Sequence, residues 1–275
     1  MPELPEVETA ARGLRERLVG RTITGVDVRD HRLRWPVDAE LGQVLANQRV
    51  ITVWRRAKYL LVGCENGSLI IHLGMSGSLQ VVAPPTQLHR HDHVVWAFAD
   101  PGKPTLSLRL RDHRRFGAVL WTTEDPLLHP LLRKLGPEPL GNQFGGDTLY
   151  DKARGKRISV KAFLMDAHVV AGIGNIYATE ALYRARIHPS RPAGRIALKR
   201  FDTLAAKVRD VLQESIGRGG TTLRDFAGSD GSLGYFIQDL DVYGRAGLPC
   251  RQCGMALKGR VIAQRSTVFC GTCQR

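Results

Sequence analysis

The sequence predicts an α+β protein in which a helix precedes an antiparallel β-sandwich or barrel, and further helices lead to a cysteine-rich C-terminal module. Three observations predict this class. Apolar residues recur at helical spacing after residue 5, short β-type runs continue to about residue 125, and helical patterns then separate this region from four cysteines. At 275 residues, the chain is long enough for two domains that each bury a core.

The leading helix is predicted over residues 5–19. Gly20 is suited to end it, because glycine readily adopts the conformation that follows a helix. The apolar residues that share the helical spacing are Val7, Ala10, Ala11, Leu14 and Leu18.

The β region is read from runs of β-branched and aromatic residues that Gly, Pro, Asp and Asn interrupt. Residues 131–150 are rich in Pro and Gly and are predicted to connect two domains. Helical patterns follow at 159–170, 175–185 and 196–217.

The net charge of +14 is unevenly distributed, with +3 in residues 1–130 and +11 in residues 131–275. Such a bias favours a polyanionic partner, and nucleic acid above all, although a ribosomal or membrane-surface protein would show the same balance. No apolar run approaches the roughly 20 residues of a membrane-spanning helix, and a signal peptide is not expected. We therefore expect a cytoplasmic protein that does not bind membranes.

Four of the five cysteines form the pattern C-x2-C-x16-C-x2-C. Two such pairs can offer four thiolates to one tetrahedral Zn²⁺, which leaves no position for substrate and indicates a structural metal. Two disulfides are the alternative, although a reducing cytosol disfavours them. The ligands would be Cys250, Cys253, Cys270 and Cys273, whereas Cys64 fits a buried strand position.

The segment MPELPE begins directly before the predicted helix. Removal of Met1 would leave the secondary amine of Pro2, and an α-amino group, with a pKa of about 7.7–8.0, is far more often neutral at pH 7 than a lysine. A neutral amine is a nucleophile, and Glu3 and Glu6 are placed to serve it as acid or base. Pro and Glu are also common in the first turn of any helix, so this pattern alone leaves both interpretations open.

Two predicted turns carry side chains that a turn does not need. Gly74 and Gly77 bracket Met75 at a predicted hairpin tip, and Arg114 and Phe116 occupy a similar position between two strands. Exposed apolar tips near arginines suit a wedge that separates stacked bases. Met75 and Phe116 could instead pack inward, as large apolar residues usually do.

Three further patterns are weaker. Asn175 is predicted to cap the helix that begins at Ile176, and alternation along a strand would place Arg56 and Lys58 on one face. A solvated surface would explain that pair equally well. The alternating histidines of HRHDH could share a face and bind a metal, although the cysteine module already accounts for a zinc.

Taken together, the motifs resemble those of the bacterial formamidopyrimidine-DNA glycosylases. In chain order they are PELPEVET, RRAKYLL, HLGMSG, RRFG, KAFLMD, VVAGIGNIYATEAL, GGTTLRDF, VYGR and the four-cysteine module. The resemblance implies an N-terminal catalytic β-sandwich over residues 1–130 and a linker over 131–150. It further implies a helix-two-turn-helix domain over 151–238, with a loop around 219–235 that closes on the lesion, and a zinc finger over 239–275.

The same resemblance implies a bifunctional glycosylase and abasic-site lyase of base excision repair, which removes 8-oxoguanine and formamidopyrimidines from double-stranded DNA. We expect a monomer with one structural zinc. Pro2 would be the nucleophile that forms a Schiff base with the sugar, Glu3 the acid that assists ring opening, and Lys58 a supporting catalytic lysine. Glu6 would belong to the lesion pocket.

The resemblance also implies which residues contact DNA. Met75, Arg114 and Phe116 would fill the gap left by the extruded nucleotide, and Arg114 would address the orphaned cytosine. The remaining expected DNA contacts are His72, Lys161, Asn175, Tyr177 and Arg265.

Two rival interpretations remain. An endonuclease VIII type of glycosylase also uses an N-terminal proline but prefers oxidised pyrimidines, and PELPEVET, HLGMSG and RRFG argue against it. A non-catalytic nucleic-acid-binding zinc protein would use the helices and the finger for anchoring alone, which leaves Pro2 and Glu3 without a role.

Overall fold

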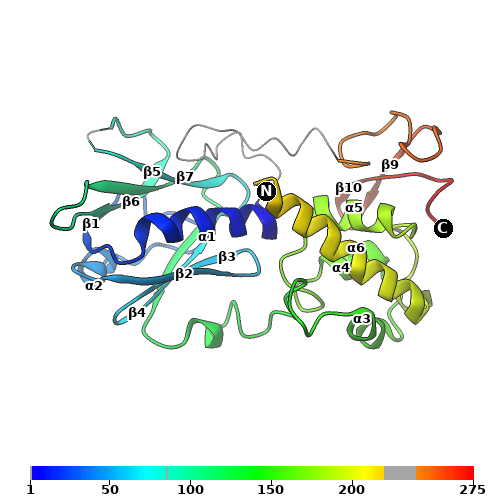
Figure 1. Ribbon diagram of the computed structural model, residues 1–275, viewed down its shortest axis with the longest axis horizontal. Coiled ribbons are helices and arrows are strands. Elements are labelled where there is room, and N and C mark those ends of the chain that lie inside the picture. Colours follow the sequence, from blue (N-terminus) through cyan, green and yellow to red (C-terminus); the bar gives the residue numbers. More distant parts are fainter. Residues whose placement is uncertain (1, 85, 220–239) are drawn as a thin grey trace. The chain divides into compact units, whose positions relative to one another are not determined.

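A computed structural model describes residues 2–84, 86–219 and 240–275 of the chain (Figure 1). The chain divides into two compact units. Residues up to Arg133 make up most of the first, and Lys134–Gly217 with the described C-terminal residues make up the second. Within the described ranges, none of the helices has both the length and the apolar character that crossing a membrane requires.

Two antiparallel sheets of four strands each form the first unit, which confirms the predicted sandwich. One sheet has the order β1-β6-β7-β5 and the other β2-β3-β4-β8. Their bounds are β1 Ile23–Val28, β2 Val50–Arg56, β3 Tyr59–Cys64, β4 Gly67–His72, β5 Gly77–Val82, β6 Asp92–Phe98, β7 Leu106–Asp112 and β8 Ala118–Thr122. The chain therefore changes sheet between β4 and β5 and again between β7 and β8.

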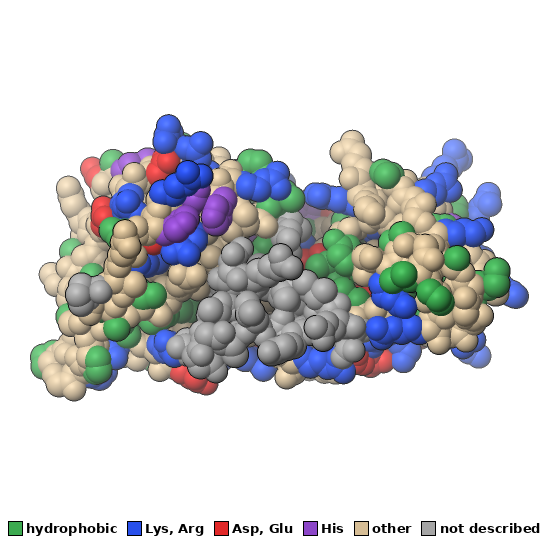
Figure 2. Space-filling view, turned by 90° about the horizontal axis from the view of Figure 1, so that it is seen from above, with side chains coloured by type: hydrophobic (Ala, Val, Ile, Leu, Met, Phe, Trp, Pro, Cys, Tyr) green, Lys and Arg blue, Asp and Glu red, His purple; other side chains and the backbone are tan. Residues whose placement is uncertain are grey.

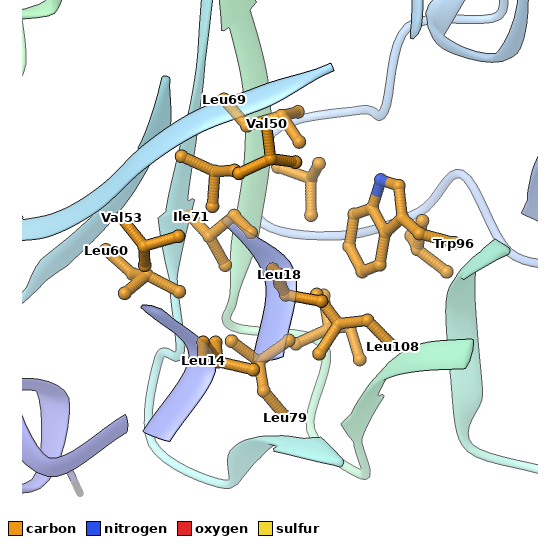
Figure 3. Packing of buried hydrophobic residues seen from close by; sticks show 14 of the residues in the cluster. Leu14, Leu18, Val50, Val53, Leu60, Leu69, Ile71, Leu79, Trp96 and Leu108 are labelled. Carbon is orange, nitrogen blue, oxygen red and sulfur yellow. The ribbon is translucent and has the colours of Figure 1, made fainter. Parts of the chain in front are cut away.

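Helix α1 spans Leu4–Leu18, within one residue of the prediction at each end. It ends where Gly20 takes a left-handed backbone conformation with φ of 76°. Its apolar stripe packs into the core shared by both sheets, where Leu14 and Leu18 lie among side chains such as Val50 and Trp96 (Figure 3). Burial of these side chains fixes α1 against the sandwich.

Helices dominate the second unit, as the sequence predicts. The packed helix pairs include α3 with α6 and α5 with α6. The bounds are α3 Gly146–Ala153, α4 Val160–Met165, α5 Asn175–Arg184, a 3-10 turn η2 Ala193–Arg195 and α6 Leu198–Gly217, followed by β9 Lys258–Ile262 and β10 Arg265–Phe269. The first unit also contains the short elements α2 Leu41–Leu45 and η1 Pro126–Leu128.

Strands β9 and β10 form a hairpin whose two-residue turn consists of Ala263 and Gln264. Both turn residues have positive φ, 49° and 60°. This is the turn geometry that matches the natural twist of a hairpin, although it normally favours Asn and Gly.

Two elements differ from the prediction. Helix α3 begins inside the stretch expected to be a linker. Its first residue, Gly146, packs so closely on α6 that a Cβ there would lie 2.0 Å from the Asp202 carboxylate. Helix α4 ends at Met165 rather than near residue 170. The chain turns there, and the Lys152 ammonium binds the His168 carbonyl at 2.6 Å.

Candidate active site

The start of α1 is built from a pair of buried carboxylates. Glu3 is the N-cap and Glu6 is the third residue of the helix, and together they form a capping box. The Glu6 carboxylate accepts the Glu3 backbone N–H at 2.8 Å, and only 1% of Glu3 and 4% of Glu6 are exposed. Pro2 is buried as well. The predicted nucleophile thus lies beside two carboxylates whose positions are fixed by the helix.

Helix α1 crosses β2 so that its first residues lie toward the end of that strand. Arg15 donates to the Val53 carbonyl at 2.8 Å, and Glu8, about two turns earlier in the helix, pairs with Arg55 at 2.9 Å. Continued along the helix, this progression brings its start toward the turn that contains Lys58.

Lys58 occupies the turn between β2 and β3, not a strand. The expectation that it alternates with Arg56 on one strand face is wrong, because β2 ends at Arg56 and Ala57 has a φ of 53°. The left-handed residue reverses the chain and redirects the side chain that follows. Lys58 is half-buried, and its positive charge acts on His72 of the adjoining strand end.

His72 ends β4 and is held as a neutral imidazole. Burial, together with the positive charges of Lys58 and Arg34, lowers the pKa of His72 to about 4. Its Nδ1 accepts the Gly74 backbone N–H at 3.1 Å, and its ring lies 4.8 Å from that of Tyr59. The remaining ring nitrogen can donate one hydrogen bond, so a phosphate oxygen is a suitable partner.

The sequence suggests that Met75 and the Arg114–Phe116 segment lie on hairpin tips, but the structure places them elsewhere. Each lies on a connection that crosses from one sheet to the other. Gly77 of β5 pairs with Asp112 of β7, and His72 of β4 pairs with Ala118 of β8. Because both ends of one connection are paired with both ends of the other, the two connections must lie side by side.

We call residues 73–76 and 113–117 the two tips. A Cβ at Gly74 would lie 2.4 Å from the Phe116 carbonyl carbon, so the backbones of the tips are in direct contact. Phe116 is 42% exposed and Met75 is half-buried. Phe116 therefore does not pack inward, and the tips present an apolar surface beside cations.

The two arginines of the second tip have different surroundings. The Arg114 side chain is exposed, and its guanidinium lies over the Phe116 ring at 4.6 Å from the ring centre. Arg115 has a left-handed backbone with φ of 56° and pairs with Asp30 at 3.2 Å. Arg114 is thus presented at the surface, whereas Arg115 shares the Asp30 carboxylate with Arg32.

In the second unit, the start of α5 meets the hairpin of the cysteine module. The prediction that Asn175 caps this helix is wrong: Gly174 is the N-cap, and the Asn175 amide donates instead to the Ser266 carbonyl at 3.1 Å. The fully buried Lys161 of α4 donates to Thr267 Oγ1 at 2.6 Å and also to the Ser266 carbonyl. Arg265, next to these residues, is exposed.

These contacts change the expected roles of two residues. The Lys161 ammonium holds β10 against α4, so its described partners are protein atoms. Tyr177 is 1% exposed and its hydroxyl is 2.6 Å from that of Ser215 in α6. Its side chain is a core residue, which leaves only its backbone, in the first turn of α5, to meet a ligand. Asn175 and Arg265 remain at the surface of this region.

The four cysteines of the C-terminal module converge on one point. Their sulfur atoms all lie within 4.8 Å of one another. Backbone N–H groups of Gln252 and Cys273 point at Cys250 Sγ and Cys270 Sγ, each at 3.4 Å, and the Tyr183 hydroxyl lies 3.2 Å from Cys250 Sγ. Such donors stabilise thiolates, so the donor set fits a tetrahedral zinc.

The histidines of HRHDH do cluster, together with His113. The ring centres of His91 and His113 are 4.4 Å apart, and those of His89 and His91 are 5.5 Å apart. Figure 2 shows histidine side chains next to Lys and Arg side chains on the surface that it draws. In the part of the chain that the structure describes, only the four cysteines are grouped closely enough to bind a metal.

The sequence does not predict a role for two buried carboxylates. Asp112 is fully buried and receives hydrogen bonds from both tips. Glu180 of α5, also fully buried, accepts the backbone N–H groups of Asp241, Val242 and Tyr243 at 2.8–3.0 Å. Burial raises the pKa of Glu180, which these three donors oppose. Single acidic residues in short motifs carry no periodic signal that would have identified them.

Comparison with known proteins agrees with this geometry. Residues 1–119 match a family model described as the formamidopyrimidine-DNA glycosylase N-terminal domain, residues 135–227 match its H2TH domain, and residues 247–275 match a zinc finger found in FPG and IleRS. The C-terminal module is therefore a zinc finger with one structural zinc.

Named relatives cover the whole chain. The formamidopyrimidine-DNA glycosylases of Alkalilimnicola ehrlichii and Methylococcus capsulatus are 55% and 52% identical to it, with 100% of each chain covered. A Lactococcus lactis FPG mutant in complex with Fapy-dG-containing DNA has a TM-score of 0.91 at 31% identity, and Lactococcus lactis Fpg in complex with abasic-site DNA has 0.90 at 32%. Both structures cover 100% of both chains. Identity above half over the full length, with all three domains in order, establishes that the chain belongs to the formamidopyrimidine-DNA glycosylase family.

Proposed function

We propose that this enzyme removes oxidised purines, such as 8-oxoguanine and formamidopyrimidines, from double-stranded DNA and then cleaves the strand at the abasic site. The observation that carries this proposal is the capping box at the start of α1, which fixes Glu3 and Glu6 beside Pro2. Because both carboxylates lie within four residues of Pro2, they are available to give or take protons at its amine. The two Lactococcus lactis complexes support DNA as the partner, since their titles name lesion-containing and abasic-site DNA.

The reaction would begin at the amine of Pro2 once Met1 is removed. The nitrogen attacks C1′ of the damaged nucleoside, so that an N–C1′ bond forms while the bond from C1′ to the base breaks, and the proton of the amine passes to the departing base. Glu3 gives a proton to the ring oxygen as the sugar opens, which leaves an iminium at C1′. The adjacent C2′ hydrogen is then acidic, and its loss expels the 3′ phosphate. A second elimination expels the 5′ phosphate.

The surrounding residues would prepare the substrate. A glycosidic bond inside a duplex is out of reach, and turning the nucleotide out costs a few kcal/mol. The two tips, with Met75, Arg114 and Phe116, would fill the gap. Lys58 and His72 in the first unit, and Asn175, Arg265 and the backbone at Tyr177 in the second, would hold phosphates.

Lys161 would act indirectly, by fixing the zinc-finger hairpin that carries Arg265. Glu6 would line the lesion pocket. The loop proposed to close on the base, around residues 219–235, lies outside the described residues from 220 onward. We also propose that the enzyme acts as a monomer in the cytoplasm, where bacterial DNA lies.

Borohydride trapping tests the proposal. A duplex with 8-oxoguanine opposite cytosine should give a covalent adduct with the mature chain, after intact mass spectrometry has shown that Met1 is gone. A chain whose N terminus is acetylated should give no adduct and bind the duplex with similar affinity, because an amide nitrogen is not nucleophilic. Failure of the mature chain to form an adduct would favour a non-catalytic binder, and preference for thymine glycol would favour an endonuclease VIII type.

A further inference from the structure

We propose that Asp112, acting through Ser76, is a positioning residue that locks the two tips into one rigid wedge, and thereby sets how well the enzyme distinguishes the base opposite the lesion. This inference rests on the proposed function of the tips. It concerns a residue that would touch neither the lesion nor the reacting sugar.

The carboxylate of Asp112 connects the two tips directly. Its Oδ1 accepts the Ser76 hydroxyl of the first tip at 2.6 Å and the Arg114 backbone N–H of the second at 3.2 Å. Its Oδ2 accepts the Gly117 N–H at 2.8 Å. The described hydrogen bonds to this carboxylate thus come only from the tips.

Ser76 completes the connection. While its hydroxyl donates to Asp112, its oxygen accepts the same Arg114 N–H at 3.1 Å. Ser76 on one connection, Arg114 on the other and Asp112 at the end of β7 therefore share one small network. Loss of either side chain would leave the Arg114 backbone with one acceptor in place of two.

Asp112 is itself anchored in the sandwich. It is the last residue of β7 and is fully buried, and its carbonyl accepts the ring N–H of His93 in β6 at 2.8 Å. A buried carboxylate is unfavourable unless its lone pairs are satisfied. Here the partners that satisfy it are donors of the tips, so the free energy of desolvation is offset only while the tips hold this conformation.

The packing of the tips requires such a constraint. Gly74, with φ of 61°, has its Cα against the Phe116–Gly117 peptide, where a Cβ would come within 2.6 Å of the Gly117 nitrogen. Glycines at these sites permit close approach but restrict the backbone little. A mobile tip would yield when pressed into stacked bases, because unstacking costs a few kcal/mol per step. The Asp112 network supplies the stiffness that the glycines lack.

The test compares Asp112→Asn and Ser76→Ala with wild type and with the control Ser78→Ala. Ser78 is 1% exposed, lies two residues further along, and its hydroxyl is a buried group without a hydrogen-bond partner in the described structure. In Asp112→Asn, the amide NH₂ cannot accept a hydrogen bond, so one of the donors of the tips loses its acceptor. Two readouts are used: the single-turnover rate of 8-oxoguanine excision opposite cytosine divided by that opposite adenine, and borohydride trapping on a single-stranded abasic oligonucleotide.

We expect Asp112→Asn to lower the cytosine-to-adenine ratio by about tenfold, which corresponds to about 1.4 kcal/mol of transition-state discrimination. Ser76→Ala should lower it by a smaller factor, and Ser78→Ala should leave it unchanged. Because a ratio does not depend on the fraction of folded enzyme, a loss of stability alone would not move it. Single-strand trapping, which requires Pro2 but no opened duplex, should proceed at the wild-type rate per folded molecule.

Unchanged ratios in both Asp112→Asn and Ser76→Ala would overturn the inference. So would an equal loss of single-strand trapping in Asp112→Asn, since that would place the residue in the chemistry rather than in the tips. Failure of the proposed function itself would look different, because the wild-type chain would then neither excise 8-oxoguanine nor form an adduct with the single-stranded abasic oligonucleotide.

Discussion

The Arg114 guanidinium lies 4.6 Å from the centre of the Phe116 ring, while the adjacent Arg115 is paired with Asp30 at 3.2 Å. Stacking on the ring leaves the edge of the Arg114 guanidinium available for hydrogen bonds. Arg115 instead contacts Asp30, a carboxylate that it shares with Arg32. Of two consecutive arginines, Arg114 is therefore available to contact a ligand, whereas Arg115 contacts the protein itself.

Replacement of these arginines should therefore have unequal effects. We expect Arg114→Ala to reduce discrimination of the base opposite the lesion by about 1–3 kcal/mol, the value of a good contact between an arginine and a base edge. Arg115→Ala, the matched control, should change it little. Single-turnover excision opposite each of the four bases measures the difference, and equal effects of the two substitutions would contradict this assignment.

The lowered pKa of His72 predicts a specific sensitivity to acid. The ordinary pKa of histidine is near 6.5, and burial with the charges of Lys58 and Arg34 brings it to about 4 in the folded protein. As the pH falls, the unfolded chain therefore takes up this proton before the folded protein does. Above about pH 6.5 the imidazole is neutral in both states and costs no stability, and the free energy of unfolding decreases as the pH falls toward 4. The full loss in the free energy of unfolding is on the order of 3–4 kcal/mol, at about 1.4 kcal/mol per pKa unit.

Urea unfolding at pH 7 and pH 4.5 measures this contribution. His72→Asn keeps an acceptor for the Gly74 N–H but cannot be protonated, so it should lose less stability on acidification than wild type. His31→Asn, which replaces an exposed histidine, serves as the control. If wild type and His72→Asn lost the same free energy between the two pH values, the imidazole would not be the titrating group.

Zinc removal should weaken DNA binding through the fold of the finger. Cys250 and Cys270 belong to a small core with Tyr183 and Val268, which the metal holds together. We expect Cys250→Ser to lower the zinc content and to raise the Kd for duplex DNA by about tenfold or more, or at least about 1.4 kcal/mol. Cys64→Ser changes a strand residue outside the cluster and should affect neither quantity. A zinc-free protein with unchanged affinity would refute this role.

Arg265 should contribute one phosphate contact. Its replacement by alanine is expected to weaken binding to lesion-containing and undamaged duplexes alike, and to reduce the slope of log K against log salt by about 1. Arg260→Ala removes an exposed arginine from the neighbouring strand and is the control. Fluorescence anisotropy over a range of salt concentrations gives the slopes. A slope that falls equally for Arg260 would mean that general charge, not position, matters.

Local sequence patterns predict the leading helix and the zinc site of this protein. The period of the apolar residues predicts α1, because Leu14 and Leu18 must face one core, and the spacing of two cysteine pairs predicts the zinc site. The roles of Pro2 and Glu3 followed from motif resemblance, and they remain predictions.

What the sequence did not reveal depends on partners distant in the chain. The sequence predicts a hairpin at Met75 because a strand-like run lies on either side of it. The two strands belong to different sheets, however, and only the pairing of β5 with β7 shows this. The capping role of Asn175 failed for a similar reason. Its amide has a partner, Ser266, that is 91 residues away. Helix α3 is not predicted because it begins in a stretch rich in Gly and Pro, which favours a loop. The packing of Gly146 on Asp202 of α6 has no signal in the local sequence.

The two crossing connections carry a consequence for how such an enzyme can change. Each is bounded by a paired strand at both ends, with Gly77 opposite Asp112 and His72 opposite Ala118. One residue added to either connection would need to bulge outward or shift a ladder and turn every side chain of that strand to the wrong face. Altered lesion preference is therefore more accessible to evolution, or to an engineer, by exchange of side chains at fixed length than by insertion or deletion.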